Sequence, residues 1–202
     1  MWVIKLGGSL ADYPDDLNRW LEMLAEAGRG EGVIVPGGGF FADWVREAQM
    51  RWAFDDAVAH AMALRAMEQY GLMLCGLQKR LVPACTDAEI QKALRENKVP
   101  VWLPVQMLAA TEIEPSWDVT SDSLAAWMTR HLAAEHLVLV KSCPLPEGKL
   151  DMQELSRKGI VDAAFPNFVA AAHFKVWLVG RDDYTRVFSL LATTQRKSSR
   201  LS

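Results

Sequence analysis

Short apolar runs alternate with stretches of helical periodicity along most of this chain. Within the helical stretches, apolar residues recur three and four positions apart, as Leu17, Trp20, Leu21 and Leu24 do. Helices are expected at about 14–27, 40–50, 55–80, 86–97, 121–132 and 183–191. The apolar runs lack polar residues at alternate positions, and we expect strands at 2–6, 33–35, 99–103, 137–140 and 175–179.

Continuous apolar strands separated by helices are typical of a parallel sheet that is covered on both faces. The sequence therefore predicts an α/β fold, a three-layer αβα sandwich with a mostly parallel central sheet. No internal repeat or linker divides the chain, so residues 1–202 are expected to form one domain. Gly71 and Gly76 fall in the second half of the long helix, where they predict a kink or a break.

Composition narrows the class of function. The 202 residues are 50% hydrophobic, which is enough for a core, and the net charge is −3. Basic residues form no continuous face, so binding to nucleic acid is not expected. No run approaches the roughly 18 apolar residues of a membrane span, and no signal peptide is apparent, so we expect a cytoplasmic protein. The three cysteines lack the spacing of metal ligands and are expected to be idle thiols.

Two glycine clusters each follow an apolar strand and precede a helix. Gly7 and Gly8 form the first cluster, and Gly37, Gly38 and Gly39 form the second. At the carboxyl end of a strand, glycine lets the backbone approach an anion, and the following helix presents free N–H groups. Neither cluster has the Gly-Lys-Ser/Thr ending of a P-loop or the dinucleotide-binding spacing. One cluster alone favours a plain tight turn, whereas two predict a site for phosphoryl oxygens.

Three charged residues accompany these clusters. Lys5 lies inside the first apolar strand, where a buried ammonium needs an anion. Lys141 ends the fourth strand, at the edge where a parallel sheet binds ligands. Asp122 falls in the first turn of a helix, where a carboxylate also simply complements the helix dipole.

The order of these motifs resembles that of the amino acid kinase superfamily, which includes acetylglutamate, aspartate, uridylate and isopentenyl phosphate kinases. The resemblance rests on residues 5–9 (KLGGS), 33–39 (VIVPGGG) and 121–126 (SDSLAA). It implies an ATP-dependent kinase that transfers the γ-phosphoryl of ATP to a small anionic acceptor, with Mg²⁺ as cofactor and no protein metal site.

The resemblance also implies roles for individual residues. Lys5, the backbone of both glycine clusters and Ser9 would bind the phosphates, with Gly8 and Gly38 among the groups that stabilise the transition state. Asp122 would hold two lysines in place and would act as an organiser rather than a base. Relatives bind their acceptor near the start of the long helix, where the candidate residues are Asp55, Asp56, His60 and Arg65.

The chain departs from the superfamily at its second lysine. Acetylglutamate kinases carry that lysine in a Gly-Gly-Met-x-x-Lys segment, but the counterpart here, residues 159–167, ends in Asn167. We expect Lys141 to replace the missing cation in contact with Asp122 and phosphate, with Lys158 as the alternative.

A narrower resemblance points to the branch that contains the aminomethyl-furanmethanol-phosphate kinase of methanofuran biosynthesis. It rests on residues 117–125 (WDVTSDSLA), 140–143 (VKSC) and 159–166 (GIVDAAFP). In that branch the acceptor is a phosphate monoester and the product is a diphosphate. Trp52, Trp102 and Trp117 are candidates for the wall around a furan ring, although such aromatic residues are more often core.

Other functions are also compatible with these motifs. A carbamate-, isopentenyl phosphate- or amino-acid-type kinase would share the phosphate-handling residues. A non-catalytic nucleotide- or oxoanion-binding protein is the alternative from another class, although an oxoanion store would need more than four scattered histidines. The superfamily pairs through the long helix, so a homo-oligomer, either a dimer or a trimer of dimers, is expected.

Overall fold

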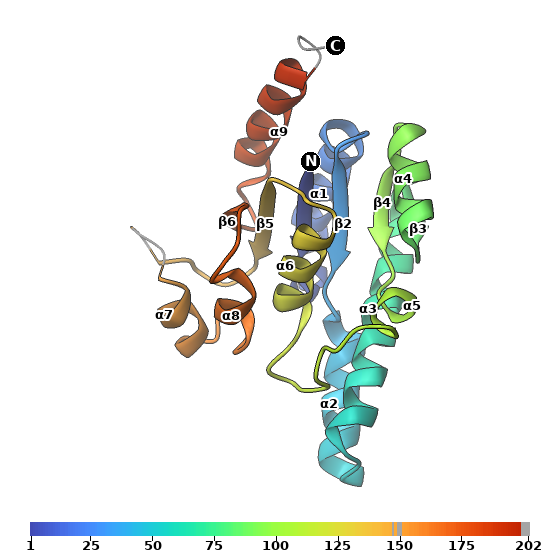
Figure 1. Ribbon diagram of the computed structural model, residues 1–202, viewed down its shortest axis with the longest axis vertical. Helices are drawn as coiled ribbons and strands as arrows, with labels where there is room; N and C mark the ends of the chain where they lie inside the picture. Colours follow the sequence, from blue (N-terminus) through green and yellow to red (C-terminus); the bar gives the residue numbers. More distant parts are fainter. Residues whose placement is uncertain (147, 149–150, 199–202) are drawn as a thin grey trace.

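Six strands form one parallel sheet in the computed structural model, which describes residues 1–146, 148 and 151–198 (Figure 1). Side chains are described as far as residue 191. The order across the sheet is β3-β4-β2-β1-β5-β6, and every pairing is parallel. The strands are β1 Trp2–Leu6, β2 Gly32–Pro36, β3 Leu81–Ala84, β4 Val99–Trp102, β5 His136–Lys141 and β6 Lys175–Gly180.

Helices cover both faces of this sheet and confirm the three-layer αβα sandwich. One core cluster joins the sheet to α1 (Pro14–Ala27), α3 (Asp56–Leu77) and α9 (Tyr184–Ser198). The other joins the opposite face mainly to α4 (Asp87–Arg95), α6 (Ser121–His131), α7 (Met152–Arg157) and α8 (Phe165–Val169). Two short elements, the 3-10 turn η1 (Gly8–Asp12) and α5 (Val105–Leu108), complete the connections around them.

The strand order places a topological switch at β1. From β1 the chain runs outward to β2 and the edge strands, then crosses to β5 on the other side of β1. Ligands of open parallel sheets bind where the strand order reverses, outside the carboxyl ends of the strands. The ends of β1, β2 and β5 therefore define the place where a site is expected.

A helical hairpin extends beyond that carboxyl edge of the sheet (Figure 1). It consists of α2 (Gly39–Trp52) and the first half of α3, joined through Ala53 in the left-handed region at φ 51°. The prediction of a break in α3 was wrong, because the helix is continuous from Asp56 to Leu77. Gly71 serves close packing instead, since a Cβ there would lie 2.9 Å from Leu103 Cδ2.

The edge strand β3 was missed in the sequence. It spans only four residues and includes Pro83, which cannot donate to a neighbouring strand. Proline is compatible with this edge position, but it removed the continuous apolar pattern by which the other strands were identified. A capping box begins the next helix, because Thr86 and Glu89 cap α4 reciprocally.

The two glycine turns lie against each other at the carboxyl edge, as the sequence predicts. Leu6 of β1 and Pro36 of β2 are register partners, so both turns leave the sheet at one level. A Cβ on Gly8 would lie 2.0 Å from the backbone nitrogen of Gly39, and a Cβ on Gly37 would lie 2.3 Å from that of Gly8. Only glycine permits this contact between backbones.

Two further observations bear on earlier expectations. No helix in the part of the chain described here has the length and apolar character that crossing a bilayer requires. Cys75, Cys85 and Cys143 are free thiols. Burial raises the pKa of Cys75 to about 11, which makes this thiol a poor nucleophile at neutral pH.

The contact between the glycine turns yields a stability prediction. Gly8→Ala should lower the free energy of unfolding by about 1–3 kcal/mol, because its Cβ overlaps the neighbouring backbone. Gly76→Ala is the control, since nothing lies within 4 Å of a Cβ there, and this variant should gain about 0.4–1 kcal/mol. Urea denaturation measures both, and equal stability of the two variants would contradict the close contact.

Candidate active site

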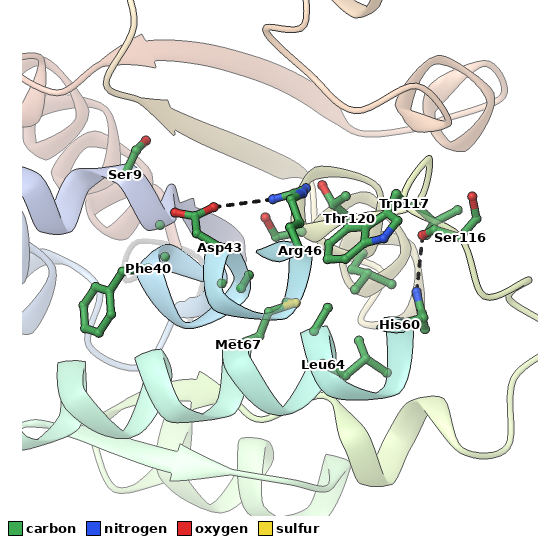
Figure 2. Close-up of a pocket in the computed structure, with 18 of the residues that line it drawn as sticks. Ser9, Phe40, Asp43, Arg46, His60, Leu64, Met67, Ser116, Trp117 and Thr120 are labelled. Atoms are coloured by element: carbon green, nitrogen blue, oxygen red, sulfur yellow. Dashed lines mark hydrogen bonds and ion pairs between the residues drawn. The ribbon is translucent and has the colours of Figure 1, made fainter. Parts of the chain in front are cut away.

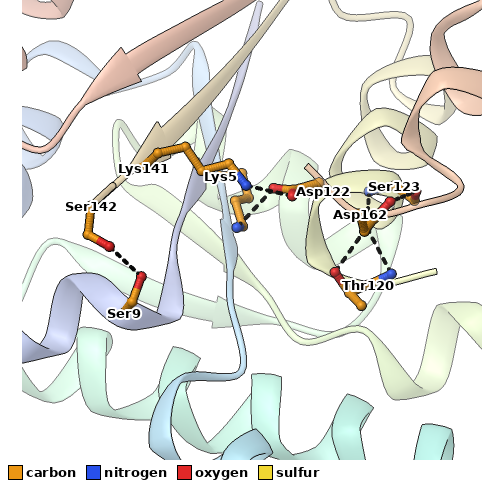
Figure 3. A network of polar contacts seen from close by, with 8 residues as sticks. All are labelled: Lys5, Ser9, Thr120, Asp122, Ser123, Lys141, Ser142 and Asp162. Carbon is orange, nitrogen blue, oxygen red and sulfur yellow. Dashed lines mark hydrogen bonds and ion pairs between the residues drawn. The ribbon is translucent and has the colours of Figure 1, made fainter. Parts of the chain in front are cut away.

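A carboxylate lies between two ammonium groups at the carboxyl edge of the sheet (Figure 3). Asp122 Oδ1 is 2.9 Å from Lys5 Nζ, and Asp122 Oδ2 is 2.6 Å from Lys141 Nζ. Lys5 and Asp122 are only 5% and 4% exposed. We call Lys5, Asp122 and Lys141 the charged triad. The contact between Lys141 and Asp122 that the sequence predicts is thus present.

The fold brings the triad together from three elements. Lys5 is the fourth residue of β1, and like Val3 it faces the side of the sheet that α6 covers. Lys141 is the last residue of β5, the strand next to β1. Asp122 is the second residue of α6. Neighbouring parallel strands thus supply the two cations, and the helix above them supplies the anion.

Opposing effects set the protonation of the triad. Burial pushes the pKa of Asp122 upward, but the charges of Lys5 and Lys141 outweigh it, and the pKa is lowered overall. Asp122 is therefore ionised at neutral pH. Burial and the charge of Lys5 lower the pKa of Lys141, Asp122 acts in the opposite direction, and the net result is a pKa of about 8. Two ammonium groups facing one carboxylate leave an excess of positive charge that favours a bound anion.

The helix α6 is capped by a residue far along the chain. Thr120 is the N-cap residue, but its side chain accepts no capping hydrogen bond. Asp162 replaces it: its Oδ2 accepts from Thr120 N at 2.9 Å, from Thr120 Oγ1 at 2.9 Å and from Ser123 N at 3.0 Å. Its Oδ1 accepts a further bond from Ser123 Oγ. The first turn of α6, which includes Asp122, is held from outside.

A cavity of about 240 Å³ opens beside the glycine turns, between the helical hairpin and the loop before α6 (Figure 2). Arg46 lies over the ring of Trp117, 4.2 Å from its centroid, and 3.6 Å from Asp43. Trp117 Nε1 donates to Gln49 Oε1 at 2.6 Å. The wall thus combines glycine backbone, an aromatic ring held in place and charged groups, and it includes Gly8, Gly38, Gly39, His60, Met67, Thr120 and Ser121.

A second cavity, of about 610 Å³, lies at the carboxyl ends of β5 and β6. Arg181 is the basic residue among its lining residues; it lies over the ring of Tyr13 at 3.9 Å and 3.3 Å from Asp16 Oδ2. Ser142, which follows Lys141, also lines this cavity. Ser9 and Ser142 share a hydrogen bond of 2.6 Å, and because Ser9 lines the first cavity, this bond joins the two (Figure 3).

The structure separates the four expected acceptor residues. His60 lines the first cavity, with its Nδ1 3.3 Å from the carbonyl oxygen of Ser116. Asp55 instead caps α3 by accepting from Val58 N, and Asp56 accepts from Gln49 Nε2. The guanidinium of Arg65 donates to the carbonyl of Ala61 on its own helix. None of Asp55, Asp56 and Arg65 is among the residues that line the first cavity.

Of the three candidate tryptophans and the two candidate lysines, only some lie at the site. Trp117 lines the first cavity, but Trp102 is a fully buried core residue and Trp52 is 71% exposed on α2. Lys158, the alternative to Lys141, pairs with Glu154 at 2.6 Å on the exposed surface of α7. Asn167 is exposed on α8. Lys141 is therefore the second lysine that contacts Asp122.

Several residues at the site were overlooked in the sequence. Asp43 and Arg46 follow Gly39 at intervals of four and seven residues, a spacing that places all three on one face of α2. Arg181 comes directly after β6, at the same sheet edge as Lys141. The helical spacing of Asp43 and Arg46 and the position of Arg181 after a strand can both be read from the sequence. Asp162 gave none, because its role depends on a contact across about forty residues of sequence.

Metal ligands do not gather in the described residues, where no three His, Cys, Asp or Glu side chains are placed to hold an ion. Both oxygens of Asp122 already face lysines.

Comparison with known proteins places this site in a family. Residues 1–144 match the amino acid kinase family. The 5-(aminomethyl)furan-3-yl-methyl phosphate kinase of Methanocaldococcus jannaschii is 25% identical over 201 residues, covering 95% of this chain and 93% of its own. The uridylate kinase of Archaeoglobus fulgidus superposes with a TM-score of 0.70 at 14% identity, over 95% of both chains. The UMP kinase of Ureaplasma parvum gives 0.65 at 16% identity, over 90% of this chain and 89% of its own.

The chain belongs to the amino acid kinase family, as its ordered motifs predict. It is a phosphotransferase that acts on a small acceptor. Within the family, it resembles the branch of the methanococcal furan phosphate kinase.

The pKa of Lys141 generates a pH prediction. As the pH rises through about 8, Lys141 loses its proton in the free enzyme, and the positive charge beside the glycine turns falls. We expect kcat/KM for ATP, which reports on the free enzyme, to fall over the same range. In Lys141→Arg the guanidinium keeps its proton, so the value should be lower but constant from pH 7 to 9. The same alkaline limb in both proteins would assign it to another group.

Proposed function

We propose that this protein transfers the γ-phosphoryl of ATP to the phosphate of a small monoester, which gives ADP and a diphosphate. The observation that carries this proposal is the charged triad, with its excess of positive charge and a carboxylate engaged at both oxygens. A hydroxyl acceptor needs a base to take its proton. A phosphate monoester has a second pKa near 6, so it is already a dianion at neutral pH and needs none.

The transfer itself follows from the arrangement of charges. An oxygen of the acceptor phosphate attacks the γ-phosphorus, and the bond from that phosphorus to the β–γ bridging oxygen breaks, so ADP leaves with the electron pair. Lys5 and Lys141 offset the charge on the transferring group and on the bridging oxygen. We expect the backbone N–H groups of Gly8, Gly38 and Gly39 to donate to its equatorial oxygens. Asp122 keeps the two lysines in position.

The two cavities suggest where each substrate binds. We assign ATP to the larger cavity beside Lys141, Ser142 and Arg181, and the acceptor to the smaller one beside the glycine turns. Sequence neighbours of the triad line both cavities, Ser121 the smaller one and Ser142 the larger one, so phosphates bound in the two cavities would meet near the triad. Mg²⁺ enters with the nucleotide and neutralises part of the phosphate charge.

The smaller cavity favours an acceptor with a single ring. Trp117, fixed by Gln49 and covered by Arg46, offers an aromatic wall, while Asp43 supplies a carboxylate for an ammonium group. These features are compatible with an aminomethyl-furanmethanol phosphate, the class of compound named for the methanococcal relative. The cytoplasmic location and the homo-oligomeric state stay predictions.

A screen of ATP consumption tests the function. Phosphate monoesters that carry a ring and an amine are compared with the same compounds without the phosphate, and ³¹P NMR identifies the product. We expect a diphosphate to form only from the monoesters. Lys5→Ala should reduce turnover by about 10²–10³. Turnover of the unphosphorylated compounds alone would overturn the proposed acceptor class, and wild-type turnover in Lys5→Ala would overturn the proposed site.

Replacing Arg46 or Arg181 by alanine tests which substrate binds in which cavity. Arg46→Ala should raise KM for the acceptor about tenfold and leave KM for ATP unchanged, because a charged hydrogen bond to one substrate is lost. Arg181→Ala should do the reverse. Steady-state kinetics with each substrate varied in turn provide both constants.

Two surface arginines serve as matched controls for that experiment. Arg51 lies over Trp52 on the same helix as Arg46, and Arg19 contacts Asp16 as Arg181 does. Neither lines a substrate cavity, so Arg51→Ala and Arg19→Ala should leave both KM values unchanged. Equal changes in both constants for Arg46→Ala or Arg181→Ala would contradict the assignment.

A further inference from the structure

Asp162 holds the helix turn that carries the central carboxylate of the triad. It lies in the loop between α7 and α8, within the connection from β5 to β6. Its carboxylate accepts four hydrogen bonds, two from Thr120 and two from Ser123. Asp122 lies between these two residues in sequence. Figure 3 shows Asp162 beside this turn, with Asp122 between it and the lysines.

This arrangement leaves little freedom to the turn. A helix begins with backbone N–H groups that have no partner within the helix, and Thr120 does not satisfy them with its own side chain. Asp162 engages backbone and hydroxyl donors on both sides of Asp122, and its negative charge complements the helix dipole. The loop is tied down a second time, because the backbone N–H of Ala164 donates to the carbonyl of Asp118 at 2.9 Å.

We propose that Asp162 is a positioning residue for phosphoryl transfer: it fixes the first turn of α6 so that the Asp122 carboxylate meets both lysines. The inference rests on the proposed function, in which those lysines neutralise the phosphates. It adds that the connection bordering the nucleotide cavity is mechanically joined to the transfer centre. A shift of about 1 Å in a catalytic group costs up to about 10²-fold in rate, so such a residue affects kcat without touching substrate.

Asp162 also acts on Lys141 through its charge. Three charged groups affect the pKa of Lys141: Lys5 on β1 lowers it, and Asp122 on α6 and Asp162 on the α7–α8 loop raise it. Asp162 raises the pKa of Lys141 and so favours its protonated form. A residue that only fastened the loop would leave the titration of Lys141 unchanged, and this difference provides a test.

The test compares Asp162→Asn with Asp151→Asn. Asp151 is a matched control because it caps α7 in the same connection, accepting from Gln153 N and Glu154 N, but does not contact α6. We expect Asp162→Asn to lower kcat about 10- to 100-fold with both KM values little changed. Its alkaline limb of kcat/KM should move to lower pH. Asp151→Asn should keep the kcat and the pH profile of the wild type.

A second measurement does not depend on turnover. The ammonium of Lys141 is titrated by NMR in the free protein, and urea denaturation records the stability of each variant. The titration of Lys141 should move to lower pH in Asp162→Asn and stay unchanged in Asp151→Asn. If Asp162→Asn loses stability but keeps its kcat and its Lys141 titration, the inference is wrong. If the wild type phosphorylates no acceptor while the titration shifts as expected, the proposed function fails and the positioning of the triad by Asp162 stands.

Discussion

The ion pairs of Lys5 and Lys141 with Asp122 are the interaction on which the rest of this structure depends. Burying charge is costly, and two ammonium groups on one carboxylate leave that cost only partly repaid. In the proposed function, the substrate phosphates would supply the missing negative charge. The pKa of Lys141 is lowered by burial and by the charge of Lys5, which Asp122 offsets only in part. Asp122 holds the two cations together, and the net positive charge that remains favours a bound anion.

The fold is arranged to keep this charge together and accessible. Because β1 lies between β2 and β5, a lysine on β1 reaches both the glycine turns and the end of β5. The turns approach each other closely enough to exclude a Cβ, which presents backbone N–H groups in place of side chains. Cations on strands and amides on turns converge from different elements. Neither set requires a flexible segment to come into place.

The sequence predicted what local patterns determine. Continuous apolar runs identified five of the six strands, and glycine next to strand ends identified the two turns that adjoin at the carboxyl edge. It failed where tertiary contacts decide: Gly71 in α3 serves packing rather than a break, and Pro83 lies in an edge strand. Asp162 caps a helix some forty residues earlier, which no local pattern reveals. Asp55 and Asp56 were chosen by proximity in sequence and do not line the smaller cavity, whereas Asp43 and Arg46 on α2 line it.

The helical hairpin has a consequence for how such an enzyme can diversify. It supplies Arg46, His60 and Met67 to the smaller cavity, to which we assign the acceptor, yet it extends beyond the sheet that holds the triad (Figure 1). Substitutions on it can reshape the pocket while the strands, the glycine turns and the lysines keep their geometry. Selection can therefore act on substrate choice and on phosphoryl chemistry almost separately. One ancestral transfer centre can in this way serve metabolites of very different shape.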